Sequence, residues 1–594
     1  MMFVEYLLNE GIPKNLRFSG IVDKKSLVAH LSKIAKEHPD LYPAVVQNVK
    51  KVGDIMATFE GVSVGLDDIT PDYKARNKLI DDAEKDIKGE KDAPTVVRRL
   101  LKAQSDGMAL GTKHKGSLQR QVESGSRGKA GQFLKTVFSP VVAKGPDDSP
   151  LPYLIRRSYA EGLSPGEYWL TAGEARRETA LVQTSTSLPG ESTKLISAVL
   201  NSSIISTPDC GTKNGLDYDI TDAHALERYE AGTNHLITDA YVRDLKKKKV
   251  TTIKVRSPLT CLEHPGVCQK CYGHNNQGHL QTVGTNVGLR AAQSMSEPLT
   301  QMVLSAKHGG FMAREQKPEL LGARGFRQLV SIPEIFKDEA VLADKAGKVG
   351  KIEKSPQGGW NVHVDDAVHY VNPKRKLMVF SGQKVSPGDQ ISDGIPNPKS
   401  VVAIQGLGAG RQYMKDTIYD IYKRSGIDID KRHVELFVKQ NLNNVKITQG
   451  DPDGKFTRGD VVPYNQLREH LAEDTKTISL GPQSIGQRLG EEYLHFSAGT
   501  PITQQIHDTL KESGISKVAI TLQPTTFEPI MKPIEQVPLL SNDWLSRLSH
   551  RRIKDTLMKG PAEGWHTDVH SQSPYPSLAF GSHDFGKDIE KGHY

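Results

Sequence analysis

The sequence contains 594 residues, which at about 150 residues per domain corresponds to roughly four compact units and excludes a peptide-sized binding module. Hydrophobic residues make up 37% and charged residues 25%, an ordinary soluble composition without an apolar run long enough to cross a bilayer. The first residues, MMFVEYLLNEG, do not have the basic leader and apolar segment of a signal peptide, so a cytoplasmic location is predicted. The net charge of +8 favours a polyanionic partner such as nucleic acid but does not identify one.

Residues 1–140 predict a mixed helical region that contains a basic loop. A charged, helix-prone stretch occupies residues 74–91, and the segment at 111–132 is basic and dotted with glycine. Its composition fits a loop that contacts phosphates or another subunit, and it fits a solvated basic loop equally well.

A long helix is predicted after the turn-rich string GPDDSPLP. Ser164, Pro165 and Glu167 form a good helix start, since they supply a cap, a proline at the first helical position and a capping-box acid. The helix should extend at least to Thr186. The Pro-Gly pair at 189–190 then predicts a kink or a break, because proline removes one helical hydrogen bond and glycine loosens the backbone.

The four cysteines can form one metal site. Cys268 and Cys271 form a C-x2-C knuckle, in which two thiolates grip one tetrahedral ion, and Cys261 lies in the same short loop. Cys210 is the remaining cysteine, and the glycine after it suits a tight ligand loop. Four thiolates leave no open coordination position, so a single zinc held by them would be structural. Two alternatives stay open: a redox pair at Cys268 and Cys271, and His264 as a ligand in place of Cys210.

The later part of the chain predicts a small beta-rich unit followed by helices. Apolar and polar residues alternate over 352–364 around a turn-forming string, which indicates a hairpin. Helices are predicted at 413–423 and 431–441. In the first of them, three apolar residues on one face are interpreted as core: Ile418, Ile421 and Tyr422.

Several strings stand in a definite order along the chain. SGSRGK at 124–129 comes first, followed by GLSPGEYWLTAGEARRETALVQTSTSLPGESTKL. DCGT at 209–212, CLEHPGVCQKCYGHN and VGLRAAQSMSEPLTQMVLSAKHGG come next, and GARGFRQLVSIPEIF and SGIDIDKRHVELFVKQ follow. In this order they resemble elements of the beta-prime subunits of multisubunit DNA-directed RNA polymerases: the fork loop, the bridge helix, the zinc-cysteine segment, the two trigger-loop arms and a late conserved block.

The resemblance implies an α+β, multidomain fold that is mostly helical, with a small beta-rich middle unit and a zinc-binding knuckle. The predicted regions, in chain order, are 1–140 with the fork-type basic loop, 141–206 around the bridge helix, 207–286 around the zinc site, 287–340 for the trigger loop, 341–400 for the beta-rich unit, 401–527 for a helical and mixed clamp-side region, and 528–594 for a divergent tail.

In this family the trigger loop folds against the bridge helix when the correct nucleotide is bound. The resemblance places His308 near the triphosphate as a positional or proton-donating group, a role that histidine chemistry allows. Gln301 matches the motif, and Leu304 stands where the family usually has a methionine that packs on the base. Ser305 departs from the pattern, because an arginine is common there, and Lys307 or another subunit would have to supply that charge.

The resemblance also marks residues of the bridge helix. Arg176 lies at a matching position, and Thr186 and Ser187 are expected to face the template base. The Pro-Gly pair at 189–190 would mark the point where the helix flexes during translocation, and the simpler alternative is a kink inside a core.

The aspartate string NADFDGD, which holds the catalytic magnesium in this family, does not occur in the sequence. The resemblance therefore implies that the magnesium ligands lie on a separate polypeptide, as in the divided large subunits of cyanobacteria, plastids and some large bacteriophages. The divergent bridge helix, the short middle region and the unfamiliar ending favour a bacteriophage source, acting in the host cytoplasm.

The predicted function is RNA synthesis on a DNA template by a multisubunit complex, with no activity in the isolated chain. The implied partners are the aspartate-bearing part of beta-prime, beta-type subunits, DNA, RNA and nucleoside triphosphates, and no membrane. The alternative is a non-catalytic zinc-containing scaffold or DNA-binding subunit that kept the fold. Ser305 favours this alternative, whereas His308 together with Gln301 favours the enzyme.

Overall fold

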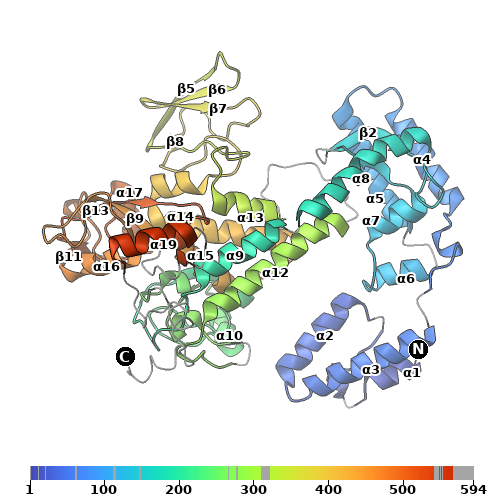
Figure 1. Ribbon diagram of the computed structural model, residues 1–594, viewed down its shortest axis with the longest axis horizontal. Helices are drawn as coiled ribbons and strands as arrows, with labels where there is room; N and C mark the ends of the chain where they lie inside the picture. The colour runs from blue at the N-terminus through green and yellow to red at the C-terminus, as the bar shows by residue number, and fades with distance from the viewer. Residues whose placement is uncertain are drawn as a thin grey trace. The chain divides into compact units, whose positions relative to one another are not determined.

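The computed structural model describes residues 2–565 apart from 11, 21, 61–62, 112–115, 146–148, 186, 265, 276–277, 309–321, 495, 541–546, 549 and 551–552 (Figure 1). The chain divides into two compact units. The first comprises residues 1–186 and 303–317, and the second comprises 187–302 and 318–594. None of the helices in the described part of the chain is long and apolar enough to span a membrane.

The N-terminal part of the first unit is a small helical bundle. α1 (Met2–Leu8) and α2 (Lys24–Glu37) both pack on α3 (Tyr42–Glu60). α2 begins at a capping box, in which the Asp23 carboxylate accepts a hydrogen bond from the Ser26 amide and the Ser26 hydroxyl accepts one from the Asp23 amide. The core cluster of this bundle consists of Ile12, Leu16, Phe18, Ile34 and Val45.

A pair of helices and a two-stranded sheet form the next part of the first unit. α4 (Tyr73–Ile87) packs on α5 (Ala93–Gly111), and α5 packs on the antiparallel strands β1 (Val141–Lys144) and β2 (Pro150–Ile155). α4 confirms the helix predicted for the charged stretch. The shared core consists of Ile80, Ala83, Val96, Leu100, Ala103, Val141 and Val142.

Three short helical segments follow α5 in the chain. They are α6 (Ser117–Glu123), α7 (Ala130–Phe133) and the π-helix η3 (Leu134–Phe138). Much of the segment predicted to be a basic loop is therefore helical. In α6, the side chains of Gln119 and Glu123 hydrogen-bond one turn apart, a local support that a count of glycines and basic residues does not detect.

The long helix α8 (Pro165–Ser185) begins where the sequence predicted. Glu167 Oε2 accepts hydrogen bonds from the amide and the hydroxyl of Ser164, at 2.9 and 2.7 Å. Glu167 Oε1 accepts hydrogen bonds from the amides of Arg156 and Arg157, at 2.7 and 3.1 Å. The predicted capping box is thus confirmed, and the same carboxylate also holds the chain that leads into the helix.

The helix α9 (Ser187–Leu200) belongs to the second unit, and Thr186 lies outside the described residues. Pro189 and Gly190 are both helical, so the break predicted there is not observed. The carbonyl of Pro189 accepts a 2.8 Å hydrogen bond from the hydroxyl of Thr193. Proline removes only one backbone donor, and the helix continues beyond it.

The cysteine-bearing part of the second unit combines a strand pair with short helices. β3 (Leu216–Asp219) pairs antiparallel with β4 (Thr252–Val255), and α10 (Asp239–Lys247) lies between them in the chain. α11 (Gln269–Tyr272) follows β4. The core of this part consists of Tyr218, Ile220, Ala225, Ile237, Leu245, Ile253 and Val255.

Four longer helices form the centre of the second unit. They are α12 (Val287–His308), which belongs to this unit as far as Met302, α13 (Gly322–Ser331), α14 (Pro398–Arg424) and α15 (Lys431–Asn441). α14 contains the helix predicted at 413–423, and α15 has the predicted bounds. The three side chains of α14 that were interpreted as core are all buried: Ile418, Ile421 and Tyr422.

The beta-rich middle unit is a four-stranded antiparallel sheet of order β7-β6-β5-β8. The strands are β5 (Gly347–Lys354), β6 (Trp360–Val364), β7 (Ala367–Val371) and β8 (Lys384–Val385). β5 and β6 confirm the predicted hairpin. Its turn needs Gly359, which has a φ of 81° and lies so close to β7 that a Cβ would meet the Val371 carbonyl oxygen at 2.2 Å.

The C-terminal part of the second unit contains two further small sheets. One has the order β10-β9-β13 and the other pairs β11 with β12. The strands and helices of this part are β9 (Asn444–Gln449), β10 (Val461–Pro463), α16 (Tyr464–Glu473), β11 (Thr475–Ser479), α17 (Gln504–Glu512), β12 (Lys517–Thr521), β13 (Thr526–Ile530), the 3-10 turn η7 (Val537–Leu540) and α19 (Ile553–Glu563).

Candidate metal centre and the helices around it

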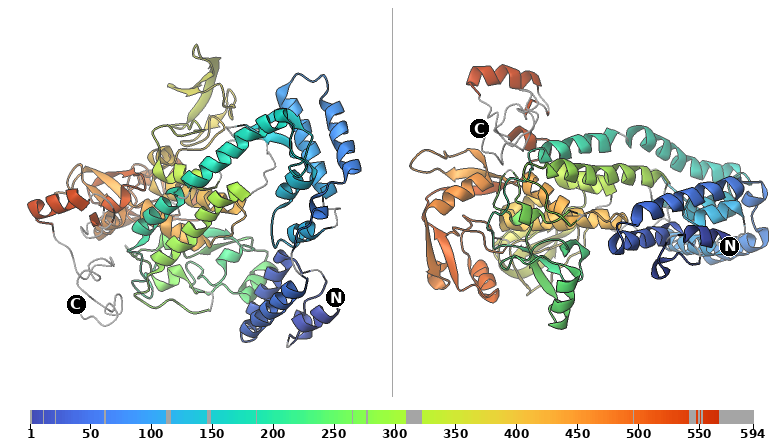
Figure 2. Two further views of the ribbon diagram at one scale, coloured as in Figure 1. Left: turned by 45° about the vertical axis from the view of Figure 1, so that its right-hand side comes forward. Right: turned by 90° about the horizontal axis from the view of Figure 1, so that it is seen from below.

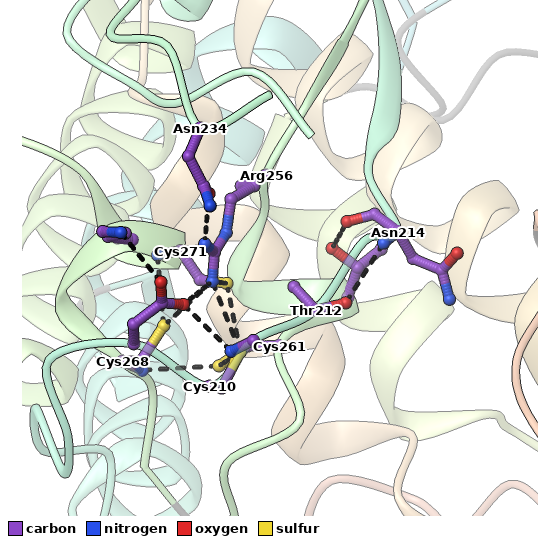
Figure 3. A network of polar contacts seen from close by, with 12 residues as sticks. Cys210, Thr212, Asn214, Asn234, Arg256, Cys261, Cys268 and Cys271 are labelled. Carbon is purple, nitrogen blue, oxygen red and sulfur yellow. Dashed lines mark hydrogen bonds and ion pairs between the residues drawn. The ribbon is translucent and has the colours of Figure 1, made fainter. Parts of the chain in front are cut away.

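The four cysteines lie together in the second unit (Figure 3). The Sγ atom of Cys210 is 3.7 Å from those of Cys271 and Cys261, and all four sulfurs lie within 4.8 Å of one another. Sulfurs bound tetrahedrally at about 2.3 Å from a zinc ion are about 3.8 Å apart. The four thiols therefore fit one tetrahedral ion, and Cys210 belongs to the set, as the sequence predicted.

Backbone amides support this arrangement. The amide of Cys268 donates to Cys261 Sγ at 3.3 Å, and the amide of Cys271 donates to Cys268 Sγ at 3.3 Å. Such bonds favour the thiolate forms that bind a metal. The alternative ligand His264 is not in the group; its ring lies beside the Asn443 side chain, and burial lowers its pKa to about 3. Since the cysteines form a group of four, the structure does not favour a separate redox pair.

The guanidinium of Arg256 lies against the sulfurs and is fully buried (Figure 3). Its Nη2 donates to an Asp209 oxygen at 2.7 Å and approaches three Sγ atoms at 3.5, 3.6 and 3.4 Å, those of Cys210, Cys268 and Cys271. Four thiolates around one divalent ion carry an excess of two negative charges. With such an ion bound, Arg256 would offset part of that charge from outside the group of sulfurs.

The carboxylate of Asp209 in turn orients Arg256. The hydrogen bond from Arg256 holds the pKa of Asp209 well below its usual value, and Lys270 Nζ, 2.8 Å from the second oxygen, acts in the same direction. Arg256 Nη1 donates to Asn234 Oδ1 at 2.6 Å. These partners restrict the guanidinium to one position, as expected for a residue that supports metal ligands.

Two cations from the C-terminal half hold the loop that carries the cysteines. Lys439 Nζ donates to the carbonyl of Gly266 at 3.1 Å and to that of Glu263, and Arg468 Nη2 donates to the carbonyl of Leu262. Burial lowers the pKa of Lys439, which is 1% exposed. Side chains of α15 and α16 thus donate hydrogen bonds to loop carbonyls that have no partner in a helix or a strand. The loop and these two helices therefore stabilise one another.

A buried ion pair joins α15 to the segment between β3 and β4. Glu435 and Arg228 are both fully buried and lie 2.7 Å apart. Glu435 also accepts hydrogen bonds from Ser257 at 2.6 Å and from Tyr218. Burial by itself raises the pKa of Glu435, but Arg228 and the hydroxyl donors outweigh it and leave the pKa below its usual value. The charge is therefore retained in the core because its partners surround it.

α12 meets α9 at a glycine. Figures 1 and 2 show the two helices side by side in the second unit. The amide of Gly288 donates to the carbonyl of Ser203 at 2.9 Å, and Asn286 Nδ2 donates to the carbonyl of Asn201 at 2.7 Å. A Cβ at Gly288 would lie 1.9 Å from the carbonyl oxygen of Leu200, so only glycine allows this approach.

α14 contacts both α12 and α13 through one side chain. The buried hydroxyl of Tyr422 donates to the carbonyl of Met295 in α12 at 2.7 Å, close to Pro298, which interrupts the hydrogen bonds of that helix. The ring of Tyr422 packs edge-on against Phe326 of α13, with the ring centroids 6.4 Å apart. Phe326 also packs on Phe437 of α15. Tyr422 therefore packs against both α12 and α13.

The predicted functional residues are only partly described. Arg176 is exposed on α8 in the first unit, and Ser187 is exposed at the start of α9 in the second unit. Thr186 lies outside the described residues. Gln301, Leu304 and His308 lie in the last turns of α12, and their side chains are outside the described residues. Of this set, the side chains of Arg176 and Ser187 are therefore the ones that the structure describes.

The first unit contains a groove along α8 that the sequence did not predict. It has a volume of about 1040 Å³ and lies between α8, η3 and the preceding turn. Lys135 and Glu174 form a 2.6 Å ion pair in its wall, and the rim includes Tyr168 and the strongly exposed Trp169. Arg176 lines the same groove.

The sequence also missed the charged residues around the cysteines. Arg256 lies close to Cys261 in the chain, but its role depends on Asp209 far upstream. Glu435 had a detectable signal, because it stands within a short apolar string formed by Val434, Leu436, Phe437 and Val438. Charged side chains in such a stretch indicate buried partners.

Comparison with known proteins places the chain in a family. The sequence profile described as RNA polymerase Rpb1, domain 5 matches residues 162–357 and 348–458, together half of the chain, so the chain belongs to this family. The matched part runs from the start of α8 to beyond α15 and includes the cysteine group.

Curated relatives make the class more specific. The chain is 28% identical over 500 residues to a DNA-directed RNA polymerase subunit beta' of Beutenbergia cavernae, covering 74% of this chain and 38% of the relative. It is 27% identical over 536 residues to that of Leifsonia xyli subsp. xyli and 28% identical over 549 residues to that of Clavibacter sepedonicus, covering 81% of this chain and 41% of each relative. The chain is a beta-prime-type region and spans about two fifths of the length of these relatives.

Proposed function

We propose that this chain supplies the bridge helix and the trigger loop of a multisubunit DNA-directed RNA polymerase. In this proposal α8 and α9 are the bridge helix, and α12 and α13 are the arms of the trigger loop. The observation that carries the proposal is the single family match over 162–458, which includes these helices and the cysteine group in the order of the resembling strings. DNA, RNA, nucleoside triphosphates and other polymerase subunits, including a beta-type subunit, are its partners, and its place of action is the cytoplasm.

Nucleotide addition is a phosphoryl transfer, so positioning and charge stabilisation supply most of the catalysis. Magnesium neutralises charge on the phosphates when bound. No NADFDGD string occurs in these 594 residues, and in our proposal the magnesium ligands belong to a separate polypeptide. A divided large subunit and a bacteriophage source are parts of the same proposal. A neighbouring reading frame with the aspartate string supports them, and a genome without one contradicts them.

The cysteine group is proposed to hold one structural zinc ion. Its four thiolates leave no position for a substrate, and backbone amides, Arg256 and α15 enclose it. A closed site of this kind contributes folding energy rather than chemistry.

His308 is the proposed group of the trigger loop that acts on the triphosphate, with Leu304 one turn and Gln301 two turns before it on α12. An interaction made mainly in the transition state lowers the rate without weakening the ground-state complex. Arg176, Thr186 and Ser187 are the proposed contributions of the bridge helix.

The test is single-nucleotide addition by the complex reconstituted with its partner subunits. His308→Ala should slow addition at saturating nucleotide by about a hundredfold if the histidine is an acid, and less if it only positions the substrate. Zinc content and template binding should not change. His279→Ala, a substitution of an exposed histidine, is the control. An unchanged rate for His308→Ala would contradict the trigger-loop proposal, and RNA synthesis by the purified chain alone would contradict the separate magnesium polypeptide.

A further inference from the structure

Arg327 of α13 lies between two carboxylates from distant parts of the chain. Its Nη1 is 2.8 Å from Glu191 Oε2, in the first turns of α9, and its Nη2 is 3.8 Å from Glu535 Oε1. All three side chains belong to the second unit. Without Arg327, α9 and the segment after β13 would bring two negative charges to the same place.

The segment at 531–540, which follows β13, also completes the end of α13. The amide of Ile534 donates to the carbonyl of Val330 at 2.9 Å, and the hydroxyl of Ser331 donates to Glu535 Oε1 at 2.7 Å. The last carbonyls of a helix have no partner within the helix, so this segment acts as a C-terminal cap. Ile534 is 1% exposed, which anchors the segment in the core.

The same segment reaches α9 directly. η7 packs on α9, and its Pro538 is buried. The segment thus touches α9 and α13, while Arg327 joins them by charge. It lies beyond the part of the chain that matches the family profile, which ends at 458. Glu535 therefore lies outside the matched part of the chain, which contains Glu191 and Arg327.

We propose that the 531–540 segment is a strut that holds α13 against α9, with Arg327 and Glu535 as its positioning residues. The inference rests on the proposed function, in which α13 is the second arm of the trigger loop and α9 the continuation of the bridge helix. The strut fixes the base of the arm, so that folding and unfolding of the loop start from one defined position. Arg327 and Glu535 act through α13 and not on the substrate.

The first test measures amide hydrogen exchange of α13 in the full chain, without any partner. The three side chains are 25–33% exposed, so each ion pair contributes little by itself. Loss of the cap together with the ion pairs should raise the exchange rate of α13 by about threefold to tenfold. Glu535→Ala and Arg327→Ala should therefore speed exchange over 322–331. The triple substitution Glu191→Arg, Arg327→Glu and Glu535→Arg, which reverses every charge, should restore the slow hydrogen exchange.

A matched control is Asp420→Ala, which removes the partner of Arg424 in an exposed pair on α14 of the same unit. It should leave exchange in α13 unchanged. The strut is overturned if Glu535→Ala leaves the hydrogen exchange of α13 unchanged, or if the triple substitution does not restore slow hydrogen exchange.

The second test uses the reconstituted enzyme. Glu535→Ala should slow single-nucleotide addition at saturating nucleotide by about threefold to tenfold, with the nucleotide KM unchanged, and the triple substitution should restore the rate. Faster exchange in α13 with an unchanged rate overturns the link between the strut and catalysis. The exchange experiment needs no polymerase activity, so it remains decisive for the strut if the proposed function itself fails.

Discussion

A Cβ at Gly288 would lie 1.9 Å from the carbonyl oxygen of Leu200. This is a backbone contact, so no side-chain rotation relieves it, and α12 can begin where it does only because residue 288 has no side chain. The contact joins the end of α9 to the start of α12, the two elements proposed as bridge helix and trigger-loop arm.

Gly288→Ala should destabilise the second unit by about 2–4 kcal/mol, because either α12 or the end of α9 must shift. The control is Gly190→Ala in α9, where an added Cβ meets nothing within 4 Å. That change should stabilise the helix by about 0.5–1 kcal/mol. Denaturant unfolding of the full chain measures both. Equal effects of the two substitutions would show that the close approach is absent in solution.

Purified chain should contain one zinc ion, measured by elemental analysis. Cys210→Ser and Cys268→Ser should each lose it together with thermal stability, because binding energy at a structural site is folding energy. His264→Gln should keep the zinc, since this histidine lies outside the sulfur group. Retention of zinc by Cys210→Ser, or its loss in His264→Gln, would instead support the ligand set in which histidine replaces Cys210.

Arg256→Gln should weaken zinc binding by about tenfold to a hundredfold, the usual effect of removing a residue that supports metal ligands. The substitution removes a buried cation from beside three sulfurs. Lys270→Gln is the matched control, because Lys270 contacts the same carboxylate, Asp209. Competition with a chromophoric chelator measures both affinities, and a similar loss in the two variants would show that Arg256 acts only through Asp209.

The start of α8 should be sensitive to acid. Burial raises the pKa of Glu167, but hydrogen bonds from Ser164 and from the amides of Arg156 and Arg157 outweigh it and lower the pKa. The ionised form therefore stabilises the fold above the unfolded pKa of about 4.3, and this contribution is lost as the pH falls through the lower, folded value. Glu167→Gln should lower the free energy of unfolding by about 1 kcal/mol at neutral pH.

The loss in Glu167→Gln should shrink as the pH falls below about 4.3, because the native carboxylate is then being neutralised as well. Unfolding curves between neutral and acid pH measure this. Glu37→Gln, at the exposed end of α2, should show little effect at any pH. A cost for Glu167→Gln that stays constant down to strong acid would exclude the carboxylate charge as the source of the stabilisation.

Local chemistry made several elements predictable. The cap at Ser164 and Glu167 involves residues three apart, and the hairpin of β5 and β6 depends on its own turn. The bounds of α15 follow from a helical pattern that starts after Asp430, whose side chain accepts from the Arg432 amide. Composition served less well at α6 and α7, where glycines and basic residues indicated a loop and the backbone is helical.

By itself, the sequence determined the set of four cysteines, the beginning of α8, the hairpin, and the family to which the chain belongs. Each depends on residue type or on contacts between near neighbours. The tertiary structure alone decided that Arg256 meets Asp209 and the sulfur of Cys210, that Gly288 packs on the carbonyl of Leu200, and that Glu535 meets Arg327. These contacts join residues far apart in the chain, where many pairings are chemically acceptable, and the packing of whole helices selects the one that forms.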